Sequence, residues 1–405
     1  MTNKEKQSRR NFLKVGLLAT GTSFLGNSSV YCKELESNTL LTIEQIPLNN
    51  ILKDFYPHDK VYGYGLTQKG INNKESWDDK RKSILRRAKI IIGEAPSDNL
   101  DMMEPVVLKE IQCNGYKESK IQFPSGTGDL IKGYLLVPNN ATISSPKPAI
   151  MALHSTGPGA SQVVGNTSNE NRSYGKELAQ RGYVVLALDV ISAGERIYPG
   201  YKPYYTNEFY KEFPLWSAMG KMIHDHKRGI DYLCRMEFVD SNNLGCIGHS
   251  LGGYNSFFLQ AFDDRIKAAV SSCGISPMGR SNAPYQFARE DWFVHFNPIC
   301  RDYIRAGMIP CDMHEIMSLC APRPLFNYSA KQDSVYFHSS AGNADWNFDK
   351  WWQTVDNALD QIAKVYELHG KAGNFVRSES DGDHDFPDEI REAAYKWLDK
   401  HLKRD

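Results

Sequence analysis

Short apolar runs alternate with helix-like segments from residue 119 onward, and this alternation restricts the fold more than any other feature of the sequence. The apolar runs cover residues 149–153, 184–188, 244–247, 266–271, 325–328 and 374–378. Helical spacing covers roughly residues 172–181, 217–236, 251–262, 348–368 and 388–402. Continuously apolar runs are typical of strands that helices cover on both faces, and helical crossovers join parallel strands. We therefore predict an α/β fold with a mostly parallel central sheet and helices on both faces.

The segment before this alternation differs in composition. Residues 33–117 are largely polar, apart from one helical stretch at residues 77–93. Residues 120–123 and 130–137, separated by a turn-rich stretch, predict an antiparallel hairpin. A chain of 405 residues is long enough for one large α/β domain with additions. We expect residues 33–117 to form an N-terminal extension packed on a main domain of residues 118–405.

The first residues have the features of an export signal. The pair Arg9-Arg10 is followed by Phe12 and by a short apolar stretch at residues 15–25. That stretch is too short to span a bilayer as a stable helix. The order of these features predicts a twin-arginine signal over residues 1–32, and hence a periplasmic or extracellular protein. The residues before Cys32 match a lipoprotein box poorly, which favours a processed secreted form over a lipid anchor.

Charge and cysteine content narrow the choice of partners. Lys plus Arg and Asp plus Glu number 48 each, so no global field favours nucleic acid or an anionic membrane, and a small-molecule partner fits better. The sequence leaves the oligomeric state open. Cys246 and Cys273 lie in apolar runs, where a free thiol is a common small hydrophobic group. A disulfide among Cys300, Cys311 and Cys320 remains open, and the absence of a Cys-x-x-Cys pair argues against zinc.

One serine stands among glycines at the junction between an apolar run and a helical segment. The stretch Gly248-His249-Ser250-Leu251-Gly252 is a Gly-x-Ser-x-Gly motif in a strand-turn-helix context. A serine on such a sharp turn has strained backbone angles, and side chains beside it would collide with the strand or the helix. The motif and its context resemble those of the α/β-hydrolase superfamily, which implies that Ser250 is a nucleophile.

That resemblance implies a Ser, then Asp or Glu, then His order along the chain. His384 lies in a loop between the last strand and the C-terminal helix, where the family places its base; His338 and His369 do not. A Pro-Arg-Pro lead-in and a strand precede Asp333, which resembles the family's pattern for the acid. We therefore predict a triad of Ser250, His384 and Asp333, with Asp345 as the weaker alternative for the acid.

An oxyanion hole is also implied by the resemblance. The N–H of Leu251, directly after the serine, is the first expected donor. The stretch His154-Ser155-Thr156-Gly157 resembles the family's His-Gly turn with Ser155 in place of the usual glycine, so the second donor is Ser155 or Thr156. We interpret His154 as a structural residue that braces this loop.

Other polar groupings have structural interpretations. His224 and His226 lie two apart on a predicted helix, point in different directions and cannot chelate a metal together. Arg228 and Asp231 are interpreted as a packing ion pair. Glu195 and Arg196 follow a strand and are interpreted as bracing their loop. We expect neither a metal nor an organic cofactor.

Among branches of the superfamily, residues 118–405 are most similar to the dienelactone hydrolase and acetyl xylan esterase-like group. Dienelactone hydrolases proper use cysteine where this chain has Ser250, and glucuronoyl esterases usually have a different elbow. The resemblance implies a secreted serine esterase acting on carbohydrate esters. A serine peptidase, a thioesterase and a non-catalytic binding protein on the same scaffold are the alternatives.

Two segments, residues 197–216 and 275–310, interrupt the strand and helix alternation and are rich in aromatic residues. Insertions after strands usually border the ligand crevice of an open α/β sheet, so we expect lid insertions here. Aromatic rings can stack on sugars or on aromatic acyl groups. The residues predicted to contact substrate are Tyr204, Tyr205, Trp216 and Trp292.

Overall fold

The computed structural model describes residues 56–57, 73–96, 105–278, 287–290, 292–305, 308–337 and 347–403. The export signal predicted at residues 1–32 lies outside the described residues, as do Asp345 and His338.

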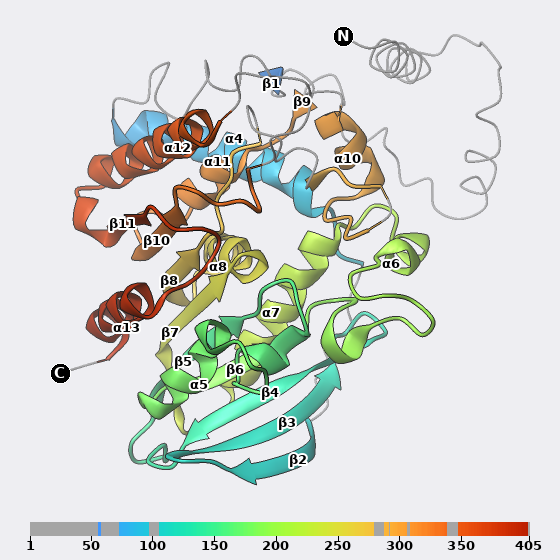
Figure 1. The fold of residues 1–405 in the computed structure, drawn as a ribbon, viewed down its shortest axis with the longest axis vertical. Helices are drawn as coiled ribbons and strands as arrows, with labels where there is room; N and C mark the ends of the chain where they lie inside the picture. Colours follow the sequence, from blue (N-terminus) through green and yellow to red (C-terminus); the bar gives the residue numbers. More distant parts are fainter. Residues whose placement is uncertain are drawn as a thin grey trace.

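A nine-stranded sheet forms the centre of the described structure (Figure 1). In spatial order its strands are β11 (Phe375–Ser380), β10 (Leu325–Ala330), β8 (Ile266–Ser272), β7 (Val239–His249), β5 (Lys147–Leu153), β6 (Val184–Leu188), β4 (Leu130–Pro138), β3 (Tyr116–Pro124) and β2 (Val106–Gln112). The strands from β11 to β6 are parallel to their neighbours, whereas β4, β3 and β2 pair in antiparallel fashion at the other end. The mostly parallel sheet and the hairpin of β3 and β4 confirm the sequence predictions.

Helices cover both faces of the sheet, and each face has its own hydrophobic core. The first core receives apolar residues from α4 (Lys74–Ile92), α7 (Ala218–Cys234), α8 (Leu251–Phe262), α11 (Met313–Ser318) and α12 (Phe348–Leu368). The second receives them from α5 (Tyr174–Gln180) and α13 (Asp388–Leu402). Successive residues of β5 alternate between the two cores: Met151 enters the first, while Ile150 and Ala152 enter the second. Burial on both faces explains why the parallel strands are apolar throughout.

Shorter elements complete the described fold. They are the helices α6 (Asn207–Glu212) and α10 (Pro298–Arg305), the strands β1 (Tyr56–Pro57) and β9 (Met308–Ile309), and the 3-10 turns η3 (Gly159–Gln162), η4 (Glu170–Arg172), η5 (Gly194–Arg196) and η6 (Ala372–Asn374). β1 pairs with β9 outside the main sheet. No helix of the described residues is both long and apolar enough to cross a bilayer.

The N-terminal part of the chain is more closely joined to the sheet than the sequence suggests. The boundary expected between residues 117 and 118 falls within β3, and β2 continues the sheet to Val106. All of β2 is exposed, and its apolar residues do not alternate with polar ones, so this edge strand lacks the two-residue period of a half-buried strand. Helix α4 places Trp77 and Ile84 in the first core. Residues on both sides of the expected boundary therefore belong to one sheet.

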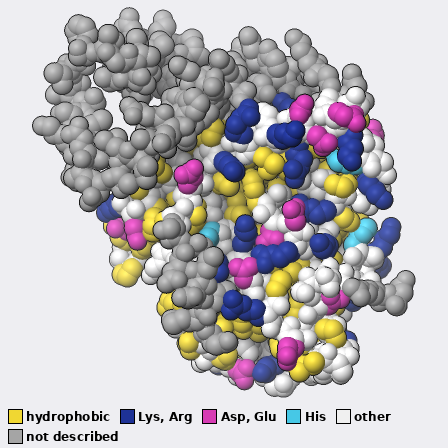
Figure 2. All heavy atoms as spheres, turned by 180° about the vertical axis from the view of Figure 1, so that it is seen from behind, with side chains coloured by type: hydrophobic (Ala, Val, Ile, Leu, Met, Phe, Trp, Pro, Cys, Tyr) yellow, Lys and Arg dark blue, Asp and Glu magenta, His cyan; other side chains and the backbone are white. Residues whose placement is uncertain are grey.

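The described cysteines form no disulfide, and charged side chains of both signs are mixed on the surface. All seven described cysteines are free thiols, including Cys300, Cys311 and Cys320, so the disulfide that the sequence left open does not form among them. Basic and acidic side chains are interspersed on the face shown in Figure 2. This mixture accords with the zero formal net charge.

A buried ion pair fixes α4 against α11. Arg87 and Glu315 form two hydrogen bonds of 2.9 and 2.8 Å, and the side chains are 1% and 5% exposed. Burial by itself would raise the pKa of Glu315, but Arg87 and Lys80 together hold it well below the ordinary value. The pair therefore stabilises the fold fully above about pH 4.5 and progressively less as the pH falls below it.

We expect Glu315→Gln to lower the free energy of unfolding by about 3–5 kcal/mol at pH 7, since the change leaves the Arg87 guanidinium buried without its counter-charge. The difference from the wild type should shrink as the pH falls from 5 to 3, because only the wild-type carboxylate titrates. Urea unfolding at several pH values measures both effects. Exposed Glu237→Gln is the matched control, and an equal loss in this control would contradict the role of the pair.

Candidate active site

The backbone at Ser250 makes the turn that the glycine pattern predicts. Strand β7 ends at His249, Ser250 has φ 58° and ψ −116°, and α8 begins at Leu251. A positive φ is uncommon for a residue other than glycine and is strained. A Cβ atom at Gly248 would lie 2.2 Å from the Gly252 backbone, and one at Gly252 would lie 1.9 Å from the Leu153 carbonyl oxygen. Only glycines fit at these two positions.

The serine hydroxyl itself is not used to hold the turn. Its backbone N–H donates to the Ser272 carbonyl at 2.8 Å, whereas its side chain does not cap α8. Helix α8 begins at the next residue, so the N–H of Leu251 has no acceptor inside the helix and lies at its positive end. Ser250, a partly exposed residue, therefore stands at the carboxyl end of a central strand and at the N-terminus of α8.

Asp333 and His384 come together although 50 residues separate them in the chain. His384 Nδ1 lies 2.6 Å from Asp333 Oδ2. The other carboxylate oxygen of Asp333 accepts the backbone N–H groups of Val335 and Tyr336, each at 3.0 Å. Asp333 is 1% exposed, so its orientation is fixed by buried hydrogen bonds. His384 Nε2 has no hydrogen-bond partner among the described residues.

His249 places the histidine loop beside the serine turn. The ring centres of His249 and His384 are 4.7 Å apart, and His249 immediately precedes Ser250. His249 Nδ1 bonds the Ser272 hydroxyl at 2.9 Å, and burial together with the charge of His384 lowers the pKa of His249 well below the usual range. It therefore remains neutral when His384 gains a proton. No role for His249 was predicted from the sequence.

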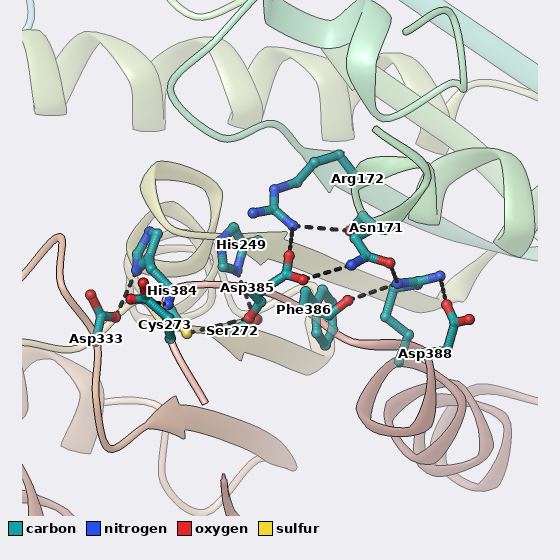
Figure 3. A network of polar contacts seen from close by, with 12 residues as sticks. Asn171, Arg172, His249, Ser272, Cys273, Asp333, His384, Asp385, Phe386 and Asp388 are labelled. Carbon is teal, nitrogen blue, oxygen red and sulfur yellow. Dashed lines mark hydrogen bonds and ion pairs between the residues drawn. The ribbon is translucent and has the colours of Figure 1, made fainter. Parts of the chain in front are cut away.

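Carboxylates flanking His384 fix the loop that carries it. Asp383 accepts hydrogen bonds from the Ser334 N–H at 2.8 Å and the Ser334 hydroxyl at 3.0 Å, which joins the His384 loop to the Asp333 loop. Asp385 bonds Arg172 and Asn171 at 2.6 Å each (Figure 3). Sequence reasoning treated this acidic stretch only as the surroundings of His384. The two aspartates directly beside His384 were a visible signal in the sequence. Their partners could not be predicted, because Ser334, Asn171 and Arg172 lie on distant segments.

The loop after β5 is braced from several sides. The Ser155 carbonyl accepts from Gln162 at 2.9 Å, and the Tyr204 hydroxyl bonds the Gly157 N–H at 2.7 Å and its carbonyl at 2.9 Å. His154 is buried, and its Nε2 accepts the Val190 N–H at 3.1 Å, in agreement with a bracing role. These contacts hold Ser155 and Thr156 in place. The second expected oxyanion donor is therefore still either the N–H of Ser155 or that of Thr156.

A second set of contacts fixes the neighbouring loop after β6. Asp189 accepts the N–H of Ala160 at 2.7 Å and that of Glu195 at 3.0 Å. Buried Arg196 bonds the Asp189 carbonyl at 2.8 Å and pairs with Asp129 and Asp225. Glu195 pairs with Lys120. The loop-bracing interpretation of Glu195 and Arg196 agrees with these contacts.

The predicted aromatic contacts occupy two kinds of position. Trp216 and Tyr204 are each 3% exposed, and Trp216 packs against Phe209 and His224 in the first core. Buried rings have no free face for a sugar, so the interpretation of these two as substrate contacts is corrected to packing and loop bracing. Tyr205 and Trp292 are partly exposed and remain available.

Two groupings could suggest a metal. His224 Nε2 lies 3.0 Å from the Ser125 carbonyl, while Asp225 pairs with Lys221 and Arg196, so these neighbours have separate partners. Ligand atoms of Cys273, Asp333 and His384 lie within 4.8 Å of one another. Burial and the nearby Asp333 raise the pKa of the Cys273 thiol well above its usual range, and the other two groups already bond each other. A metal would have to replace that hydrogen bond, so this donor set fits one poorly.

The predicted ion pair of α7 is also present. Arg228 Nη1 lies 3.3 Å from Asp231 Oδ2, and Asp231 also pairs with Arg265 at 2.6 Å. His369, the third histidine considered for the base, caps the end of α12.

The parallel sheet and the strained serine turn at the end of its central strand define an α/β-hydrolase. The sequence matches the Abhydrolase family described as Abhydrolase_7 over residues 47–282, and the chain belongs to this family. A Bacillus subtilis (strain 168) protein named "Putative hydrolase YtaP" is 25% identical over 331 residues, which are 80% of this chain and 99% of that protein.

Solved structures of similar fold include carbohydrate esterases. A glucuronoyl esterase from Solibacter usitatus has a TM-score of 0.61 at 19% identity, covering 84% of this chain and 96% of that one. A "putative acetyl xylan esterase" from Bacteroides fragilis NCTC 9343 has a TM-score of 0.59 at 16% identity, covering 90% of this chain and 96% of that one. At such identities the similarity establishes a shared fold.

Proposed function

We propose that this protein is a serine hydrolase of carboxylic esters, with Ser250 as nucleophile, His384 as base and Asp333 as the acid that orients it. The observation that carries the proposal is the 2.6 Å contact between His384 and Asp333. This pair lies next to His249, the residue before Ser250, whose backbone is strained and whose side chain does not cap α8. Backbone strain of this kind gathers at functional sites.

The proposed reaction has two halves. His384 Nε2 takes the proton of the Ser250 hydroxyl as its oxygen attacks the ester carbonyl, and Asp333 stabilises the charged imidazole through Nδ1. The Leu251 N–H, with that of Ser155 or Thr156, binds the negative oxygen of the tetrahedral intermediate. The alcohol leaves with the proton from His384. Water, activated by the same histidine, then releases the acid from the acyl-enzyme.

Carbohydrate esters are the substrate class we favour. The proteins of similar fold reported above are named as a glucuronoyl esterase and a putative acetyl xylan esterase, and both names describe an ester in which one component is a sugar. Tyr205 and Trp292 supply partly exposed aromatic surface on the two insertions, as sugar-binding sites require. The twin-arginine pattern before residue 26 would export the enzyme to where polymeric carbohydrate is found.

Activity against 4-nitrophenyl acetate, butyrate and octanoate, together with acetate release from acetylated xylan, tests this function. We expect turnover to fall with chain length and acetate to be released from the polymer. Trp292→Ala should raise KM for acetylated xylan by about 2- to 13-fold, because stacking on an aromatic ring contributes about 0.5–1.5 kcal/mol. The same variant should change turnover of 4-nitrophenyl acetate little. No acetate release, or preference for octanoate, would contradict a carbohydrate deacetylase.

A further inference from the structure

A partly buried arginine in the second insertion has no acidic partner among the described residues. Arg289 lies in the second insertion, with its guanidinium carbon 4.6 Å from the ring centre of Trp292. No described residue forms an ion pair or a hydrogen bond with its side chain, although most buried or half-buried arginines of the described chain do so. Arg87, Arg196 and Arg391 each bond one or more carboxylates.

The surroundings of Arg289 connect it to the proposed catalytic groups. Burial lowers the pKa of Arg289, and the nearby Tyr254 and Tyr336 act in the opposite direction; Tyr254 lies one helical turn after Ser250. Tyr336 donates its N–H to Asp333 at 3.0 Å, and its ring centre lies 5.5 Å from that of His384. Tyr254 and Tyr336 thus connect Arg289 electrostatically to residues that contact or closely follow the proposed members of the triad.

The remaining neighbours form an aromatic wall. The Tyr254 hydroxyl and His295 Nε2 are 2.5 Å apart, and Phe293 and Phe287 pack against His295 with ring centres 4.1 and 5.3 Å away. Burial, followed by the charge of Arg289, lowers the pKa of His295 to about 3, so this histidine is neutral and supplies no competing charge.

Holding a guanidinium in such surroundings is unfavourable unless an anion joins it. Desolvation of a charged group costs several kcal/mol, and stacking on one tryptophan offsets only part of this. The planar fork of arginine suits a carboxylate or a sulfate, which it can bind through two parallel hydrogen bonds.

We propose that Arg289 recognises an anionic group, a carboxylate or a sulfate ester, on the alcohol part of the substrate. This inference rests on the proposed ester hydrolysis and makes its substrate an acylated acidic sugar. Trp292 stacks on the guanidinium and orients it, while the aromatic wall excludes water from the ion pair that forms on binding.

Acetylated methyl β-D-glucuronoside, methyl β-D-glucoside and methyl β-D-glucoside 6-sulfate form a matched series for the test. We expect a higher kcat/KM for one of the two anionic sugars than for the neutral one, and the preferred sugar identifies the anion. Arg289→Gln should lower the ratio of anionic to neutral kcat/KM by about 10- to 100-fold, chiefly through KM, as expected for lost charge-assisted hydrogen bonds. Arg289→Lys should keep part of the preference, because lysine has the same positive charge but cannot form the two parallel hydrogen bonds of a guanidinium.

Arg235→Gln is the matched control, because Arg235 is exposed at the end of α7 and precedes the start of β7, whereas Ser250 follows the end of that strand. Its ratio should equal that of the wild type. A wild type without preference for either anion, or an Arg289→Gln variant with an unaltered ratio, overturns the inference.

Failure of the proposed function has a different signature. An enzyme that hydrolyses none of the three sugars and is not labelled by a fluorophosphonate at Ser250 would not be a serine esterase. Calorimetric binding of the unacetylated methyl β-D-glucuronoside and of the 6-sulfate then decides the question for Arg289. Binding that Arg289→Gln abolishes supports an anion site, whereas no binding of either sugar overturns it.

Discussion

Ser250→Ala is expected to lower kcat for 4-nitrophenyl acetate by roughly 10⁵-fold, since the variant has no oxygen to form the acyl-enzyme. The side chain makes no cap for α8, and its backbone N–H bond to Ser272 remains in alanine. The fold should therefore persist. Removing the hydroxyl leaves the expected oxyanion donors in place, so a small rate above the uncatalysed reaction should remain.

Steady-state kinetics and fluorophosphonate labelling measure this result, with circular dichroism and thermal unfolding to show that the variant is folded. Ser241→Ala is the matched control, because Ser241 lies exposed on the same strand β7, away from its carboxyl end. A folded Ser250→Ala enzyme that keeps more than about one per cent of its activity would refute the nucleophile.

Asp333→Asn should reduce kcat by about 10³- to 10⁴-fold with little change in KM. The amide can keep the hydrogen bonds from Val335 and Tyr336, but it can also donate to His384 Nδ1. This favours the imidazole tautomer with its proton on Nε2, which cannot accept the proton of Ser250. The charge that would stabilise the protonated imidazole is lost as well.

The comparison with Asp345→Asn separates the two acids that the sequence allowed. Because Asp333 contacts His384 directly, Asp345→Asn should retain most of the wild-type kcat. Activity that falls further in Asp345→Asn than in Asp333→Asn would reassign the acid. Thermal unfolding of both variants controls for a change in stability, since Asp333 is buried.

The strands and helices were largely predictable because their signals are local. Residues 184–188, 251–262, 348–368 and 388–402 have the same bounds in the sequence interpretation and in the structure. Apolar runs and helical periodicity depend on burial of nearby residues, which a single sequence displays. Strand β2 was missed because an exposed edge strand has no such periodicity.

The elbow was predictable for a similar reason. Gly248 and Gly252 are needed because backbone atoms come very close to both positions around the turn. In the structure, a Cβ atom at either position would collide with these backbone atoms. By contrast, nothing in the neighbouring sequence of Trp216 or Tyr204 distinguishes a ring buried against other segments from one facing a ligand.

The sequence by itself determined the α/β class, the order of the elements and the turn at Ser250, since each depends on residues close together in the chain. Only the tertiary structure decided that Asp333 meets His384, that Asp383 and Asp385 fix the histidine loop, and that Arg289 stands without an acidic partner among the described residues. Those contacts join the ends of parallel strands and separate loops. Their distances depend on how the strands align and how the helices pack, which local sequence patterns do not specify.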